Sequence, residues 1–271
     1  MSDKDLLPEP ALKEEDNSSH VPENDVEAPL IDHLRELRKR IMIVVSSILL
    51  AFIVCFLFAG NIYDFLVQPL ADAYETPSER RLIFTGLTEM FFTQVKLAFF
   101  GAFIIAFPVI GSQLYKFAAP GLYKHERRVM LPFLIGGPVL FIIGAAMAYY
   151  FIFPLAWKFF LGFESLGENG ALAIQLEARV SEYLSLVMRM IIAFGVGFQL
   201  PLLLLLLARV GLVTAEGLAR KRKYALLGIL VFAAVITPPD LISQIGLAFP
   251  LLFLYECSII SCRMTESKKR G

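Results

Sequence analysis

Four long runs without a charged side chain stand out in the chain beyond residue 40. The runs cover 41–63, 97–115, 129–157 and 190–208. A helix needs about 20 apolar residues to cross a hydrocarbon core about 30 Å thick, and each run is long enough. The pattern therefore predicts four membrane-spanning helices. They are expected at about 41–62, 97–117, 130–155 and 183–208.

The last apolar stretch, 224–262, has a different pattern because two adjacent prolines stand near its middle. Pro238 and Pro239 lack backbone donors and disfavour the helical conformation just before them, so a helix should end there. The stretch predicts a hairpin of two short spans, 224–238 and 241–257, each about 22–26 Å long at 1.5 Å per residue. In total the pattern predicts an all-α membrane protein with six transmembrane helices.

Five prolines fall inside the predicted spans, namely Pro108, Pro132, Pro138, Pro201 and Pro250. A membrane helix tolerates proline where neighbouring groups satisfy the freed carbonyl, and the result is a kink. We therefore expect kinked helices that form a concave wall.

The segment between the first two spans, about 61–96, begins with apolar residues at roughly helical spacing. These are Ile62, Phe65, Leu66 and Leu70. Their spacing predicts a short helix at the membrane interface, with a capped loop as the alternative.

The distribution of Lys and Arg predicts the orientation. Leaving aside the two lysines of the N-terminal tail, seventeen of them lie before the first span, after the second, after the fourth and after the sixth, against six on the other side. Because cytoplasmic loops carry the excess of Lys and Arg, both termini are expected in the cytoplasm.

The two ends of the chain differ from the membrane domain, which is expected at 31–262. Residues 1–30 contain nine acidic residues, two lysines and four prolines. Such a segment buries too little apolar surface to offset its chain entropy, so it is predicted to be a disordered acidic cytoplasmic tail. Residues 263–271 are predicted to form a second cytoplasmic tail.

Composition agrees with a bilayer as solvent and excludes several classes of protein. Hydrophobic residues make up 57% of the chain and charged residues only 18%, against about 25% in a typical soluble domain. The formal net charge is zero, so the basic excess of a nucleic-acid binder is absent. The three cysteines have neither disulfide-framework nor zinc-site spacing, and no metal or cofactor is expected.

Groups that would support catalysis or ion transport are sparse in the predicted spans. All three histidines lie outside them, so an enzyme is not expected. In the fourth span Gln199 stands two residues before Pro201, and its amide is expected to hydrogen-bond a neighbouring helix. A multi-span secondary transporter of a small solute or ion is the alternative function.

Two acidic residues stand within basic clusters on the predicted cytoplasmic side. Glu36 lies in H-L-R-E-L-R-K-R before the first span, and Glu126 lies in Y-K-H-E-R-R before the third. A carboxylate binds a guanidinium through two parallel charge-assisted hydrogen bonds, so two such acids predict a site for adjacent arginines. The alternative is local pairing, for example of Glu36 with Arg40 one turn later.

Five motifs occur in order along the chain. They are H-L-R-E-L-R-K-R at 33–40, Pro69-Leu70, F-A-A-P-G-L-Y-K-H-E-R-R at 117–128, A-F-G-V-G-F-Q-L-P at 193–201 and T-P-P-D at 237–240. Together they resemble the TatC family, the multi-span receptor of the twin-arginine protein translocase. The resemblance extends over about 30–262, and the block at 117–128 is highly specific.

The resemblance implies a role for each matching position. Glu36 and Glu126 match the acidic residues that contact the twin arginines of signal peptides. The surrounding recognition surface is matched by Arg38, Phe117 and Lys124. Positions concerned with assembly or partner contact are matched by Pro69, Gln199 and Asp240. Gln199 stands where many members carry a membrane-embedded Glu, and an amide can hydrogen-bond there but does not titrate.

The resemblance also implies a function and a setting. The chain is expected to be the core receptor of a Sec-independent translocase in the bacterial cytoplasmic (inner) membrane, where it binds the signal peptides of folded cargo. Its expected partners are TatA- and TatB-type single-span subunits, further copies of itself within a larger complex, and the lipid bilayer. No nucleic-acid partner is implied.

Overall fold

The computed structural model describes residues 24–74, 81–118, 127–165, 172, 174–237 and 240–270. Over these residues the chain is almost wholly helical, and its β contacts are two isolated bridges. The helices are α1 (Asn24–Leu57), α2 (Ala59–Ala71), α3 (Glu89–Ala118), α4 (Arg127–Met147), the π turn η4 (Ala148–Ile152), α5 (Phe153–Leu161), α6 (Val180–Gly197), α7 (Leu200–Val210), α8 (Ala215–Arg220), α9 (Arg222–Ile236) and α10 (Leu241–Arg270). The predicted all-α architecture is confirmed for this part of the chain.

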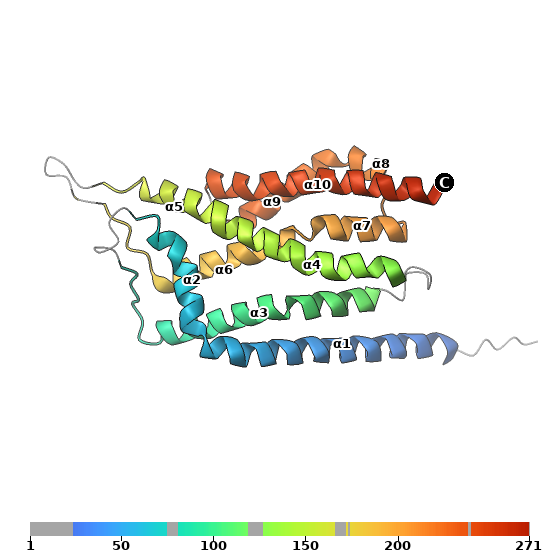
Figure 1. Ribbon diagram of the computed structural model, residues 1–271, viewed down its shortest axis with the longest axis horizontal. Coiled ribbons are helices and arrows are strands. Elements are labelled where there is room, and N and C mark those ends of the chain that lie inside the picture. The colour runs from blue at the N-terminus through green and yellow to red at the C-terminus, as the bar shows by residue number, and fades with distance from the viewer. Residues whose placement is uncertain are drawn as a thin grey trace, which may run out of the picture.

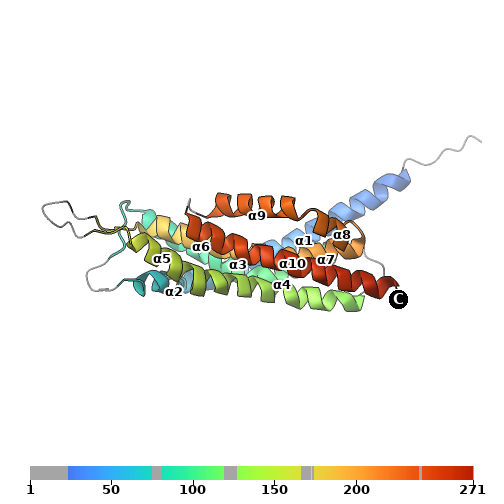
Figure 2. The ribbon, with the colours of Figure 1, turned by 90° about the horizontal axis from the view of Figure 1, so that it is seen from above.

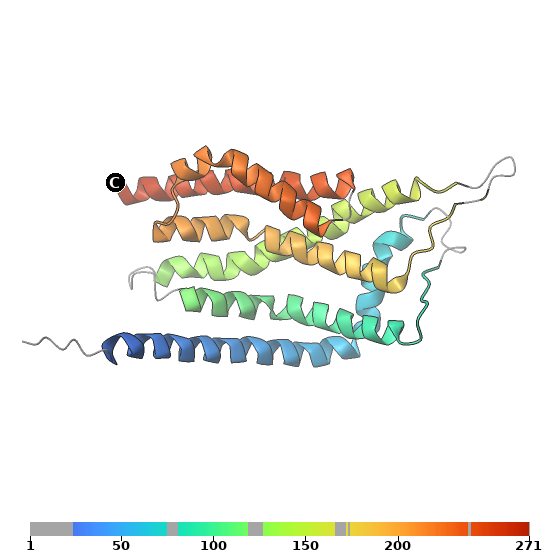
Figure 3. The ribbon, with the colours of Figure 1, turned by 180° about the vertical axis from the view of Figure 1, so that it is seen from behind.

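The long helices stand side by side in one row (Figures 1 and 3). Along the row α1 packs on α3, α3 on α4, α4 on α6, and α7 on α10. The short helix α9 packs on α10 and runs beside only part of it (Figure 2). The start of α1 and the end of α10 lie at one end of the row, which we call the terminal end. The opposite end is crossed by α2, and we call it the cap end.

Five helical segments are long and apolar enough to cross a membrane. They are Leu34–Leu57, Glu89–Phe117, Leu134–Leu161, Val180–Arg209 and Leu241–Glu266. The first four overlap the four charge-free runs. Such runs form helices because a helix satisfies all of its backbone hydrogen-bonding groups internally, as the hydrocarbon core requires. The chain is thus a multi-pass membrane protein.

The last two helices differ in length, although the sequence predicted two short ones. α9 has 15 residues and fits the prediction. The prediction for the other is wrong, because α10 has 30 residues and continues through Pro250 to Arg270. The helix persists because its second half packs on the row: Ile259 and Cys262 are buried there.

Another boundary also differs from the prediction. α1 begins at Asn24, inside the segment predicted to be disordered, whereas residues 1–23 lie outside the described part of the chain.

The fourth span is broken between α6 and α7. Phe198 and Gln199 interrupt the helix, and the Gln199 N–H donates to the Val196 carbonyl at 2.9 Å, three residues back. The break follows from Pro201, which has no N–H to donate to the carbonyl four residues before it.

The third span contains a different irregularity. The helix widens into η4, which ends two residues before Pro154, and this proline likewise has no N–H. Of the five prolines predicted inside the spans, the four other than Pro201 do not end their helices: Pro108 lies in α3, Pro132 and Pro138 in α4, and Pro250 in α10.

The segment predicted to form a short helix after the first span is α2, so the helix is confirmed, and its position at the membrane interface stays a prediction. Its apolar face is buried, including Leu66, Pro69 and Leu70. It crosses the cap end of the row instead of continuing α1 (Figure 1).

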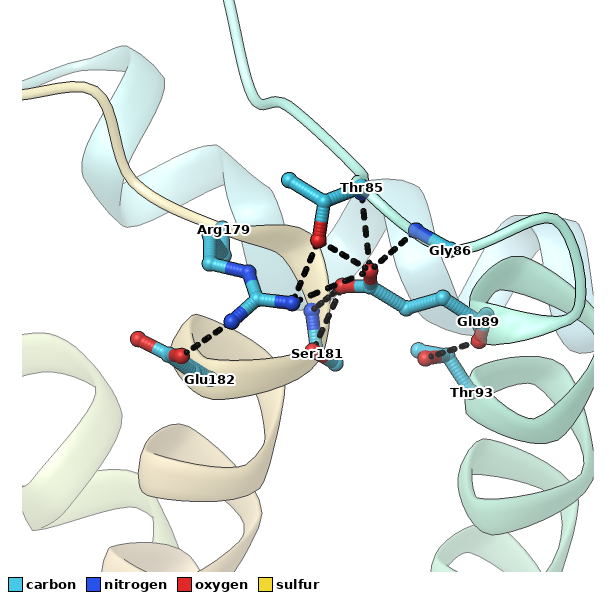
Figure 4. A network of polar contacts seen from close by, with 7 residues as sticks. All are labelled: Thr85, Gly86, Glu89, Thr93, Arg179, Ser181 and Glu182. Carbon is cyan, nitrogen blue, oxygen red and sulfur yellow. Dashed lines mark hydrogen bonds and ion pairs between the residues drawn. The ribbon is translucent and has the colours of Figure 1, made fainter.

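A polar network joins two chain segments at the cap end (Figure 4). At the start of α3 the Glu89 carboxylate accepts hydrogen bonds from the backbone N–H groups of Thr85 at 2.9 Å and Gly86 at 3.2 Å. It also accepts one from the Ser181 hydroxyl at 2.6 Å and lies 3.5 Å from the Arg179 guanidinium. Some of these donors precede α3 and the others stand at the start of α6. One carboxylate therefore caps α3 and ties it to α6.

A backbone bridge lies beside this network. The Ile83 N–H donates to the Ala178 carbonyl at 3.1 Å, and the Val180 N–H donates to the Ile83 carbonyl at 2.9 Å. The cap end therefore joins the segments before α3 and α6 through both backbone and side-chain bonds.

The centre of the row depends on a close approach between α4 and α6. Gly144 of α4 lies against Phe194 of α6, where a Cβ on Gly144 would come within 2.6 Å of the Phe194 carbonyl oxygen. Phe141 and Phe194 are among the most deeply buried side chains of the described residues. Glycine allows the two backbones to meet, as small residues do in membrane helix packing.

Candidate functional site

The acid of the first motif lies near the terminal end of the row, on α1. Its carboxylate accepts a hydrogen bond from the Arg40 guanidinium one turn later. The side chain of Glu36 is 37% exposed and that of Arg40 is 17% exposed. The local pairing considered as the alternative is thus present in the structure. Arg38, the next predicted site residue, is exposed to the surroundings.

A shallow hollow on α1 adjoins this acid. It is lined by Arg35, Arg38, Lys39, Met42, Ile43 and Ser46. The hollow is thus lined both by positively charged side chains, those of Arg35, Arg38 and Lys39, and by the apolar side chains of Met42 and Ile43.

The second motif lies where α3 ends and α4 begins. Phe117, in the last turn of α3, is half-buried. Glu126 and Lys124 fall at positions outside the described residues, directly before α4 in the sequence. The end of α3 and the start of α4 lie at the terminal end, as does the start of α1 (Figure 1).

An apolar cavity of about 160 Å³ lies between α3, α4 and the α6–α7 junction. Its lining residues are Phe107, Ile110, Gly111, Leu114, Tyr115, Leu134, Gly137, Pro138, Gln199, Leu202, Leu203 and Leu206. The Gln199 amide N–H₂ donates to the Gly137 carbonyl at 2.9 Å and, more weakly, to the Gly195 carbonyl at 3.4 Å. The predicted bond to a neighbouring helix is confirmed.

The other two predicted site residues lie at the cap end. Pro69 is buried in α2. Asp240 precedes α10 and accepts a hydrogen bond from the Ser243 N–H at 2.6 Å, so it caps that helix. The structure thus separates the predicted residues: Glu36 and Phe117 lie toward one end, whereas Pro69 and Asp240 lie at the other.

Several strong contacts were not predicted from the sequence. Arg222 and Glu256 form a bidentate pair at 2.7 and 2.8 Å that ties the start of α9 to α10. The Glu89 network joins residues about 90 positions apart. The only local signal was an acid near a helix start, which sequence patterns associate with capping but not with a distant serine.

Comparison with known proteins gives a consistent result. The family model described as "Sec-independent protein translocase protein (TatC)" matches residues 32–250. A protein of that name from Magnetococcus marinus is 47% identical over 90% of this chain and 88% of its own length. The corresponding proteins of Rickettsia prowazekii and Escherichia coli K12 are 42% and 38% identical, over 88% and 90% of this chain and 94% and 91% of theirs.

A solved structure is also similar. The crystal structure described as the twin arginine translocase receptor TatC in DDM superposes with a TM-score of 0.73 at 39% identity, covering 85% of this chain and 99% of that one. These matches span nearly all of the helical row, so the chain belongs to the TatC family of Sec-independent protein translocase proteins.

Proposed function

We propose that this protein is the receptor of a twin-arginine translocase and binds the signal peptides of folded proteins at its cytoplasmic face. The observation that carries the proposal is the likeness, over nearly the whole chain, to structures described as the twin arginine translocase receptor. The motifs at 33–40 and 117–128 supply the acids for such a ligand. The comparisons favour this function over the small-solute or ion transporter.

The proposed topology has six spans with both termini in the cytoplasm. α9 is taken as the fifth span, about 22 Å long at 1.5 Å per residue, and α10 as the sixth. Two observations support this orientation: the start of α1 and the end of α10 share one end of the row, and Lys and Arg are concentrated in the segments at that end. For a translocase receptor with this topology, the bacterial cytoplasmic (inner) membrane is the proposed location.

The binding chemistry follows from the partly exposed carboxylate of Glu36 at the terminal end. Glu36 already binds one guanidinium, that of Arg40, so its geometry accepts this group. A pair of this kind one helical turn apart contributes only about 0.3–0.5 kcal/mol. An arginine of the peptide can therefore displace or join Arg40 at little cost. Glu126 is proposed to bind the second arginine, with Arg38, Phe117 and Lys124 around them.

The apolar stretch that follows the arginines is proposed to enter the cavity between α3, α4 and α7. Its lining is almost entirely apolar, and Tyr115 lies two residues before Phe117 on α3. An apolar chain leaving the arginine site thus reaches this cavity along α3. The bends at η4 and at the α6–α7 junction shape the proposed concave wall on which the peptide lies.

The proposed partners are TatA- and TatB-type single-span subunits and further copies of this chain. Each would pack on the apolar, exposed faces of the row within the bilayer. Pro69, Gln199 and Asp240 are proposed to support that assembly through the helices they shape or join. In this account the protein acts by binding and requires neither an enzymatic step nor a cofactor.

The proposal is tested with the purified protein in lipid nanodiscs. A labelled signal peptide with two arginines is titrated beside a peptide in which both are lysines. We expect the arginine peptide to bind at least about tenfold more tightly, since lysine keeps the charge but loses the bidentate geometry. Equal affinities, or uptake of a small solute by liposomes that contain only this chain, would contradict the receptor function.

A further inference from the structure

Two tyrosines from distant parts of the chain hold successive carbonyls of α2. The Tyr149 hydroxyl of η4 donates to the Phe65 carbonyl at 2.7 Å. The Tyr183 hydroxyl of α6 donates to the Leu66 carbonyl at 2.9 Å. Both tyrosines are buried, with 8% and 6% of their surface exposed. These bonds attach α2 to two different helices at the cap end.

The Phe65 carbonyl is available because of Pro69. In a regular helix the N–H of residue 69 would donate to the carbonyl of residue 65, but proline has no N–H. Its ring also pushes that carbonyl away from the helix axis. A polar backbone group at a buried contact needs a donor from elsewhere, and the Tyr149 hydroxyl supplies it.

The helix that carries the donor Tyr149 is also irregular beside a proline. Tyr149 lies in the π turn η4, which ends at Ile152, two residues before Pro154. A π turn contains one extra residue per turn and so redirects the side chains in it. Tyr149 is thereby aimed at α2, where its ring also stacks on that of Phe65 with centroids 4.4 Å apart.

We propose that Pro69, Tyr149 and Tyr183 form a lock that fixes α2 across the cap end. In this lock Pro69 frees the Phe65 carbonyl for Tyr149, and Tyr183 holds the adjacent carbonyl. The buried side chains of Leu66 and Leu70 then pack in one register against the helices beneath. The lock is a positioning device, and it is independent of the ligand that the terminal end binds.

The lock predicts an interaction between two substitutions. Tyr149→Phe removes one hydroxyl and should raise the hydrogen-exchange rate of α2 amides about fivefold, the ratio expected for one neutral hydrogen bond. Pro69→Ala restores an N–H that can itself serve the Phe65 carbonyl. In the Pro69→Ala background, Tyr149→Phe should therefore change exchange less than twofold, because the restored N–H then satisfies the Phe65 carbonyl without the Tyr149 hydroxyl.

The test uses the full-length protein in nanodiscs, with hydrogen exchange read by mass spectrometry over α2. Tyr150→Phe is the matched control: it removes the neighbouring hydroxyl, whose side chain is 65% exposed and forms no hydrogen bond within the described residues. Tyr183→Phe should also raise α2 exchange, independently of Pro69→Ala.

Two results would overturn the lock. One is a Tyr149→Phe effect no larger than that of Tyr150→Phe. The other is an effect of Tyr149→Phe that remains fivefold in the Pro69→Ala background. Should Pro69→Ala fail to accumulate, the comparison of Tyr149→Phe and Tyr183→Phe with Tyr150→Phe still decides, because these three changes remove only a hydroxyl.

Discussion

Replacing Glu36 and Glu126 together by alanine is expected to weaken binding of a twin-arginine peptide by about a hundredfold or more. Each lost pair removes hydrogen bonds between charged groups, which contribute about 1.5 kcal/mol or more, and 1.4 kcal/mol corresponds to a tenfold change in affinity. Each single substitution should have a smaller effect. The measurement is an equilibrium titration of labelled peptide with the protein in nanodiscs.

A matched control separates this site from a general change of charge. Glu216→Ala removes an acid that is 84% exposed and paired with Arg220 on α8, away from α1. This variant should bind the peptide as the unchanged protein does. Thermal unfolding of the double variant should be nearly unaffected, because exposed ion pairs contribute only about 0–1 kcal/mol. Loss of the double variant from the membrane would instead assign these acids a structural role.

Replacing Gly144 by alanine is expected to destabilise the protein by about 1–3 kcal/mol, the range found for overpacked cores. The new methyl group would lie 2.6 Å from the carbonyl oxygen and 2.9 Å from the carbonyl carbon of Phe194. These are backbone atoms, so relief requires α4 and α6 to move apart. The measurement is denaturant or thermal unfolding in detergent micelles.

The control for this prediction is Gly228→Ala in α9. A Cβ at Gly228 would have no atom within 4 Å, and alanine is favoured over glycine in a helix by up to about 1 kcal/mol. This variant should be as stable as the unchanged protein or more so. If Gly144→Ala matched Gly228→Ala in stability, the close approach of α4 and α6 would not be a source of stability.

The sequence predicted the helices of this fold well, because the bilayer imposes a simple rule on apolar length. The four charge-free runs all lie in long apolar helical segments, the fourth of them broken at Pro201, and α9 ends within two residues of its predicted end before the proline pair. The length of α10 was misjudged because its continuation depends on tertiary contacts. The burial of Ile259 and Cys262 stabilises a polar extension that its composition alone suggested to be a tail.

The candidate site was predictable only in part. The acid Glu36 stood out because it interrupts a basic cluster, and a local pattern of this kind is visible in one sequence. Contacts between residues far apart in the sequence could not be predicted. Tyr149 and Phe65 are 84 positions apart, and no local pattern marks a hydroxyl that donates to a freed carbonyl. Pro69 was identified through family resemblance, whereas its physical role, to free the Phe65 carbonyl, became visible only in the fold.

The central claim is that two acids at the cytoplasmic face bind the arginine pair of a signal peptide. It is tested most directly by photo-crosslinking in membrane vesicles, with a photoreactive phenylalanine analogue at position 117, which leaves both acids in place. We predict a covalent adduct with a twin-arginine peptide added from the cytoplasmic side, and its loss when Glu36 and Glu126 are both alanine. An adduct of undiminished yield without the two acids, or one formed only from the opposite side, would contradict the account.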